Sequence, residues 1–262
     1  DTKEHLSCLC RGQNFLDDGN NCLTMARKKT LPSTKKIPWW MPQMGPKEYK
    51  WILQALDNNY PNQGPLTERF EKEIEKLLGV RHAVATNSGT IAIFLALKAC
   101  GVEEGDEVIV PDITFIATAN AARLAGAKVV LVDVNPRTLM LDPVAFKRAI
   151  TKRTKAVVPV HISGRAAPMA SILAITRKHH IRVVEDAAEA LMSKHNGKLL
   201  GTFGDAGCFS LSPNKTITSG QGGIVVTNND DLYKRLRQLK NHGVIERLTG
   251  GDDVHPTMGY NF

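Results

Sequence analysis

Apolar residues along the chain follow two periodicities, and segments of the two kinds alternate. Runs such as "HAVATN" (82–87) and "EVIVP" (107–111) are short and almost continuously apolar, which is typical of strands buried on both faces. The segment "TERFEKEIEKLLG" (67–79) spaces its apolar residues three and four positions apart, which predicts an amphipathic helix. Gly79 is expected to end that helix.

The rest of the chain repeats this alternation. Further helices are expected at 47–59, 89–100, 116–126, 143–150 and 168–180. Further strands are expected at 128–134, 155–161, 181–186, 206–212 and 222–228. The alternation predicts an α/β fold of three layers, in which a mostly parallel sheet has helices on both faces. Ligands of such sheets bind beyond the carboxyl ends of the strands, so candidate chemistry is sought there.

Composition places the chain among ordinary globular proteins. Its 262 residues are enough for a large core, and 42% are apolar while 23% are charged. No apolar run approaches the ~20 residues of a membrane-spanning helix, so no membrane partner is expected.

The net charge of +8 does not by itself indicate a nucleic-acid partner. The segment "RKKTLPSTKK" (27–36) carries five of the basic residues and no acid, so the remainder is only mildly basic. Neither aromatic-rich RNA-binding strands nor a zinc-finger spacing accompanies the charge. Binding to nucleic acid is therefore not expected.

The five cysteines do not form a recognisable disulfide framework. Their number is odd, and Cys8, Cys10 and Cys22 are crowded into the first 22 residues. This distribution favours a reducing, cytoplasmic location. The pair Cys8 and Cys10 is too closely spaced for a usual zinc site, so no metal is expected.

Both ends of the sequence suggest a segment of a longer protein. The chain begins with Asp1, and the first Met is Met25, so residues 1–24 are expected to lie outside the native coding sequence. Residues 1–36 are expected to be a basic, disordered extension, and 37–262 the folded domain. The sequence stops at "MGYNF" without a polar tail or a helix end, which favours a C-terminal truncation.

Small residues follow the strand expected at 82–87. In "ATNSGTIAIFLAL" (85–97), Ser88, Gly89 and Thr90 open a helix, whose free N–H groups and dipole favour a phosphate. The alternative is an ordinary N-cap made by Ser88 or Thr90. The glycine pattern matches neither a Walker loop nor the G-x-G-x-x-G of dinucleotide folds.

Two further strand ends carry charged residues. Asp186 ends a buried strand in "RVVEDAAEA" (182–190), where it either pairs with a cation or protonated ring nitrogen or caps a helix. Lys215 lies among small polar residues in "FSLSPNKTITSGQGGIVVT" (209–227), where it either forms a Schiff base with an aldehyde or is an ordinary surface lysine. A phosphate site, an acid and an amine are together the protein groups that pyridoxal 5'-phosphate (PLP) needs.

The motifs at these strand ends resemble, in order and spacing, the sugar aminotransferases of the DegT/DnrJ/EryC1/StrS family. The resemblance runs from about Ile37 to Phe262 and rests on "NSGTIAIFLAL", "DITFIATANA", "VVEDAAEAL", "GDAGCFSLSPNKTITSGQGGIVVTN" and "GYNF". It implies the large domain of PLP-dependent transferases of fold type I, without the C-terminal small domain of the family. "EDAAEA" and "NKTITSGQGG" look most like the branch of the GDP-perosamine synthases.

The resemblance also implies roles for single residues. Lys215 resembles the lysine that binds the cofactor and carries protons, and Asp186 the partner of the pyridine nitrogen. The other implied cofactor-binding residues are Ser88, Gly89, Thr90 and Ser210 at the phosphate, Phe115 stacked on the ring, Glu189 beside the ring, and Asn261 reaching a neighbouring subunit's phosphate. The role of Asn261 implies a homodimer with shared active sites.

The roles of Phe115, Glu189 and His161 are less clearly defined by the sequence. Phe115 is equally compatible with a core aromatic. Glu189 stands where many members of the family have Gln or His, so the titration of the cofactor's phenolic oxygen is expected to differ. His161, in "VHISGRAAPM", either lines the crevice or, as we favour, is a hydrogen-bonded structural histidine.

The implied activity is PLP-dependent transfer of an amino group, with glutamate as the expected donor, to a keto sugar attached to a nucleotide. One alternative is a sugar dehydratase of the same fold, although those relatives have His in place of the lysine. The other is a noncatalytic or regulatory protein, or an inactive fragment.

Overall fold

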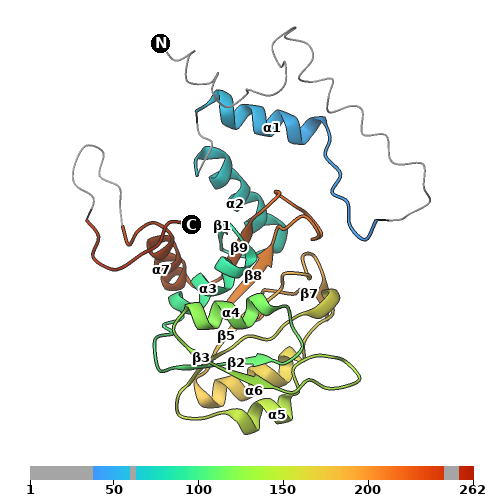
Figure 1. Cartoon of the computed structure of the whole chain (residues 1–262), viewed down its shortest axis with the longest axis vertical. Coiled ribbons are helices and arrows are strands. Elements are labelled where there is room, and N and C mark those ends of the chain that lie inside the picture. The colour runs from blue at the N-terminus through green and yellow to red at the C-terminus, as the bar shows by residue number, and fades with distance from the viewer. Residues whose placement is uncertain (1–37, 60–62, 245–253) are drawn as a thin grey trace, which may run out of the picture. The chain divides into compact units, whose positions relative to one another are not determined.

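A seven-stranded sheet forms the centre of the fold (Figure 1). The structure is a computed structural model, and it describes residues 38–59, 63–244 and 254–262. The strand order across the sheet is β1-β9-β8-β5-β4-β2-β3. These strands are β1 (His82–Thr86), β2 (Glu107–Pro111), β3 (Lys128–Val132), β4 (Thr154–Val157), β5 (Arg182–Asp186), β8 (Ala206–Ser210) and β9 (Gly223–Thr227). A separate two-stranded pair consists of β6 (Lys194–His195) and β7 (Lys198–Leu199).

Strand direction decides which strand ends can share a site. The neighbours from β3 through β2, β4 and β5 to β8 are all parallel. Strand β9 is antiparallel to both of its neighbours, β8 and β1, so β1 again runs the same way as β8. The predicted mostly parallel sheet is confirmed. The carboxyl ends of β1, β5 and β8 consequently lie at one edge of the sheet.

Seven α-helices are described around and beside the sheet. They are α1 (Pro46–Asp57), α2 (Pro65–Leu78), α3 (Gly89–Ala99), α4 (Ile116–Leu124), α5 (Pro143–Ala149), α6 (Met169–His179) and α7 (Asp230–Lys240), with a short 3₁₀ turn at Ile162–Gly164. Gly79 ends α2 in the left-handed conformation (φ 63°), as the sequence predicts. Helix α7 was not among the predicted elements.

The two faces of the sheet carry separate cores, as alternation along the strands requires. Val108 and Val110 of β2 pack in one cluster with Leu95 of α3. Ile109 between them packs on the other face with Phe146 of α5. Helices thus cover both faces, and the predicted three-layer arrangement is confirmed.

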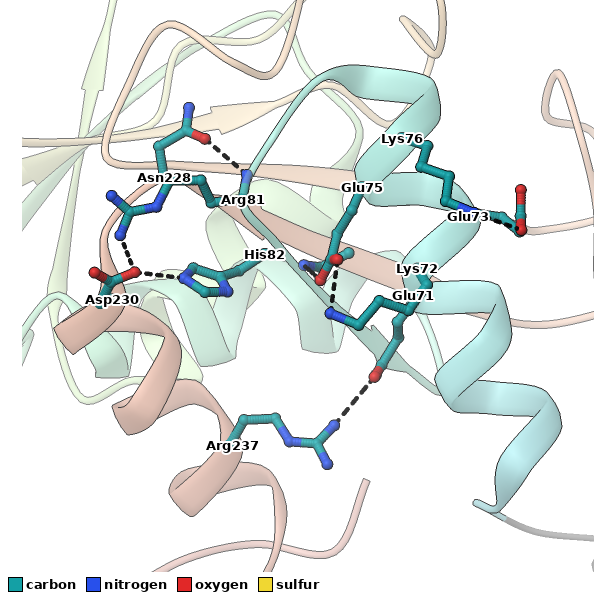
Figure 2. Close-up of polar contacts among 11 residues, drawn as sticks. Glu71, Lys72, Glu73, Glu75, Lys76, Arg81, His82, Asn228, Asp230 and Arg237 are labelled. Atoms are coloured by element: carbon teal, nitrogen blue, oxygen red, sulfur yellow. Dashed lines mark hydrogen bonds and ion pairs between the residues drawn. The ribbon is translucent and has the colours of Figure 1, made fainter.

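A buried ion-pair group ties α2 to β1 and α7. Glu71 of α2 accepts the backbone N–H of Ala85 at 2.8 Å, and its Oε2 lies 3.1 Å from Arg237 Nη1 (Figure 2). Lys240 Nζ lies 3.7 Å from Glu71 Oε1. Glu71 and Lys240 are both almost fully buried, so removing Glu71 would leave the buried charge of Lys240 without this partner.

A second polar group joins the start of β1 to α7. Asp230, at the first turn of α7, forms an ion pair with Arg81 and accepts a hydrogen bond from His82 Nε2 at 2.6 Å (Figure 2). The His82 ring stacks on Tyr233 with centroids 4.1 Å apart. The two groups together fix α7 against the antiparallel edge of the sheet.

Some expectations fall outside the described part of the chain. The extension predicted at 1–36 and the cysteines Cys8, Cys10 and Cys22 lie outside the described residues, so the predicted division into domains stays a prediction. Within the described ranges, no helix combines the length and the apolar character needed to cross a membrane.

Candidate active site

The ends of β1, β5 and β8 bring the predicted site residues to one edge of the sheet. Asp186 is the last residue of β5 and is paired in register with Cys208, two residues before the end of β8. A Cβ atom added to Gly89 would lie 2.8 Å from Cβ of Ser210, so the start of α3 contacts the end of β8. Lys215 follows in the next turn, where its N–H donates to the carbonyl of Ser212 at 3.0 Å.

The start of α3 is compatible both with an ordinary N-cap and with a phosphate site. Ser88 is the N-cap, and its Oγ accepts the N–H of Ile91 at 3.3 Å. The N–H groups of Gly89 and Thr90 belong to the first turn, where a helix has no internal acceptor for them. A capped helix therefore still offers N–H groups and a positive dipole end to an anion. Only glycine fits at position 89, because of the closeness of Ser210.

Asp186 is a buried carboxylate with two donors. Its Oδ2 accepts the hydroxyl of Thr118 at 2.6 Å, and its Oδ1 accepts the N–H of Ala188 at 3.2 Å. Burial raises the pKa of Asp186, and this effect outweighs the opposing hydrogen bonds and the nearby charge of Lys215. Residues 187–193, directly after Asp186, form turns and not a helix, so the helix-cap alternative is wrong.

Lys215 reaches back over the sheet edge to an acid from another loop. Its Nζ lies 3.4 Å from Glu189 Oε1, and its side chain is 16% exposed. Glu189 Oε2 accepts the N–H of Ser163 at 2.8 Å. Ser163 has φ 52°, a left-handed backbone that is uncommon for serine and aims its N–H at this carboxylate. The side chain of Lys215 is thus mostly buried and paired with a carboxylate, and its role in binding the cofactor stays a prediction.

Within the described ranges, the side chains of two predicted residues form no hydrogen bond or ion pair with this group. Phe115 is 76% exposed at the N-cap of α4, so the alternative that it is a core aromatic is wrong. Asn261 forms an isolated bridge with Asn241 after α7. The ring-stacking role of Phe115 and the intersubunit role of Asn261 stay predictions.

His161 is the structural histidine that the sequence favoured. It is almost fully buried, its Nδ1 accepts the N–H of Ala167 at 3.1 Å, and its Nε2 lies 2.9 Å from Glu185 Oε2. Because Nδ1 is the acceptor, the ring proton lies on Nε2 and is donated to Glu185. Glu185 also accepts the N–H groups of Gly201, Phe203 and Gly204.

Sequence reasoning missed Thr118. The signal was a polar residue on the buried side of a helix that starts at the sheet edge, because Thr118, Ala121 and Ala122 share the buried face of α4. The pairing with Asp186 could not be predicted, because Asp186 lies on a strand 68 residues away in the sequence.

The comparison that decides the family is a match over almost the whole described fold. Residues 42–262 match the model of the DegT/DnrJ/EryC1/StrS aminotransferase family. The chain belongs to this family. The resemblance read from the sequence motifs is thereby confirmed, and so is the large-domain fold.

Two relatives within the DegT/DnrJ/EryC1/StrS family have names that mention a nucleotide-linked sugar. A GDP-perosamine synthase of Caulobacter vibrioides is 44% identical over 204 residues, covering 78% of this chain and 55% of that protein. A UDP-N-acetyl-3-dehydro-alpha-D-glucosamine 3-aminotransferase of Acidithiobacillus ferrooxidans is 45% identical over 201 residues, covering 76% and 52%. The chain thus spans about half the length of these relatives.

Solved structures of aminotransferases have the same fold. DesV of S. venezuelae, solved in complex with a ketimine intermediate, is 37% identical with a TM-score of 0.75, covering 82% of this chain and 57% of that one. The sugar aminotransferase Spr1654 of Streptococcus pneumoniae, in its PLP form, is 27% identical with a TM-score of 0.81, covering 86% and 62%.

Proposed function

We propose that this chain is the cofactor-binding part of a PLP-dependent transaminase that aminates a nucleotide-linked keto sugar. The observation that supports the proposal best is the grouping of Lys215, Asp186 and the start of α3 at one edge of the sheet. A buried carboxylate, an amine and a glycine-bounded helix start are three different kinds of group, and one ligand with a ring nitrogen, an aldehyde and a phosphate fits all of them.

The described residues fit PLP in charge and in hydrogen-bonding chemistry. Asp186 is buried with a raised pKa, so a cationic ring nitrogen is the partner that would stabilise its charged form. Gly89 lets the start of α3 approach Ser210 at the end of β8, because a Cβ there would lie 2.8 Å from Cβ of Ser210. The phosphate would bind where these two elements meet, at Thr90 and Ser210. Lys215 would hold the aldehyde carbon, and the exposed ring of Phe115 is available for stacking.

PLP supplies an aldehyde that binds amines and a ring that accepts electrons from the substrate carbon. The chain's own contribution is to hold and move protons. With the cofactor bound, Lys215 Nζ would hold its aldehyde carbon and, when released by the amino donor, would serve as the base that moves a proton. Glu189 Oε1, 3.4 Å from Nζ, would keep the released amine at the site. Asp186 would hold the ring nitrogen.

Substrates and partners are inferred from the relatives. Their names combine GDP or UDP with a sugar, which supports a nucleotide sugar as the amino acceptor. Glutamate is the donor we propose, and a homodimer in which Asn261 completes the partner's site is the assembly we propose. The free, buried thiols of Cys100 and Cys208 fit a reducing cytoplasm.

The test is a titration of the purified full chain with PLP, followed by glutamate. Wild type should develop the visible absorbance of a lysine-bound cofactor, and glutamate should abolish it as the amino group moves to the cofactor. Lys215→Ala should show neither change, whereas Lys194→Ala, which alters an exposed lysine of β6, should behave as wild type.

Two outcomes would count against the proposal in different ways. If wild type and Lys215→Ala give the same spectrum, the assignment of Lys215 is wrong. If PLP binds but no amino acid removes the absorbance, the noncatalytic alternative replaces the transaminase.

A further inference from the structure

A hydroxyl group from another element holds the carboxylate of Asp186. Thr118 lies in the first turn of α4, is fully buried, and donates from Oγ1 to Asp186 Oδ2 at 2.6 Å. An ionised carboxylate is only an acceptor, and a threonine hydroxyl has a single proton to give. The proton of Thr118 is therefore committed to Asp186 whenever that carboxylate is charged.

A second hydroxyl lies next to that of Thr118 and extends the hydrogen bonding. Thr114 Oγ1 lies 2.7 Å from Thr118 Oγ1, and either atom can be the donor on geometry alone. Because Thr118 gives its proton to Asp186, Thr114 is the donor of this pair. The result is a chain of hydrogen bonds from Thr114 through Thr118 to Asp186, in which each bond polarises the next.

Besides Thr118, the described neighbours of Asp186 supply one hydrogen bond to its side chain. Ala188 N–H donates to Oδ1, and on the adjacent strand β8 the register partner is the uncharged, buried Cys208. The charge of Lys215 favours the ionised form only weakly compared with the cost of burial. Among the described neighbours, Thr118 is thus the group with the strongest opposing effect on that cost.

We propose that Thr118 is a positioning residue for the cofactor. Its hydroxyl orients the Asp186 carboxylate and favours its charged form, so that the protonated ring nitrogen of PLP binds as the counter-cation. The inference rests on the proposed function, because it assigns Asp186 to that nitrogen. It predicts that removing the Thr118 hydroxyl weakens the binding of PLP but not of a PLP analogue that lacks the ring nitrogen.

The test compares two ligands of the cofactor-free full chain. One is PLP, and the other is its deaza analogue, in which a CH group replaces the ring nitrogen. Thr118→Val keeps the shape of the side chain and removes the hydroxyl. It should weaken PLP binding by about tenfold, the size expected for losing one hydrogen bond to a charged group. Binding of the analogue should change by less than about twofold.

Two further variants separate this role from a general loss of structure. Thr118→Ser keeps the hydroxyl and should restore the affinity for PLP. Thr176→Val removes another buried helical hydroxyl, which donates to the carbonyl of Leu173 at 3.2 Å, and should leave both affinities unchanged. If Thr118→Val does not fold, Thr118→Ala carries the same prediction.

The outcomes distinguish this inference from the proposed function. Equal losses for PLP and the analogue, or no loss for either, would overturn the role of Thr118 while leaving the transaminase proposal intact. If wild type binds neither ligand, the proposed function fails, and the inference fails with it.

Discussion

Lys215 and Glu189 face each other at the carboxyl edge of the sheet, with Nζ 3.4 Å from Oε1. The sequence around Lys215 contains no acid, so this partner comes from a different loop, 26 residues away. The backbone N–H of Ser163 holds the other oxygen of Glu189 at 2.8 Å. Contacts within the chain therefore hold the Lys215 amine at the same edge of the sheet as Asp186 and the start of α3.

Gly89 should not tolerate a side chain. In Gly89→Ala the added Cβ would lie 2.8 Å from Ser210 Cβ, so α3 or β8 must shift. We expect the free energy of unfolding to fall by about 1–3 kcal/mol and the affinity for PLP to fall with it. Urea denaturation and PLP titration measure the two effects.

Gly45→Ala is the matched control for Gly89→Ala. Its new Cβ would meet only the mobile end of the Glu48 side chain, at 3.2 Å. It should cost less than about 1 kcal/mol and leave PLP binding unchanged. A Gly89→Ala variant as stable and as tightly binding as this control would refute the close approach of α3 to β8.

Glu71 should be among the residues most important for stability. Glu71→Gln leaves the buried Lys240 and the half-buried Arg237 without their carboxylate, which we expect to lower the free energy of unfolding by about 3 kcal/mol. Glu73→Gln breaks only an exposed pair with Lys76 and should cost less than about 1 kcal/mol. Similar denaturation midpoints for the two variants would show that the ion-pair group does not fix α7.

Asp230 should make stability depend on pH in the acid range. Its hydrogen bonds from Arg81 and His82 lower its pKa from 3.8 to about 2 in the folded state. The stabilisation is therefore complete above 3.8 and is lost as the pH falls toward 2. The free energy of unfolding is measured for wild type and for Asp230→Asn at several pH values. The difference between the two proteins should become smaller as the pH falls from 3.8 toward 2. A difference that is constant with pH would contradict the assigned ion pair.

Continuous apolar runs predicted the sheet well, and local chemistry explains the exceptions. Strand β2 occupies 107–111, as expected, because its residues are apolar on both faces. Strand β4 ends at Val157 although a strand was predicted to extend to 161, because Pro159 has no N–H for a regular ladder. Helix α7 was missed despite its signals, an Asn229 cap and acids in the first turn.

The candidate site could be predicted only as far as single strand ends. Asp186 and Lys215 are recognisable because each follows a buried strand and belongs to a family motif. Thr118 and the contact between Glu189 and Lys215 depend on loops that meet only after the sheet has formed, so no local pattern contains them. His161 was correctly favoured as structural, but its partner Glu185 was not foreseen.

The most direct test of the account is to find which lysine binds the cofactor. The full chain is loaded with PLP, reduced with borohydride and digested, and the peptides are mapped by mass spectrometry. The account predicts that the cofactor mass is on the peptide that contains Lys215 and that Lys215→Ala has none. Cofactor attached to a different lysine, or spread over many exposed lysines, would contradict it.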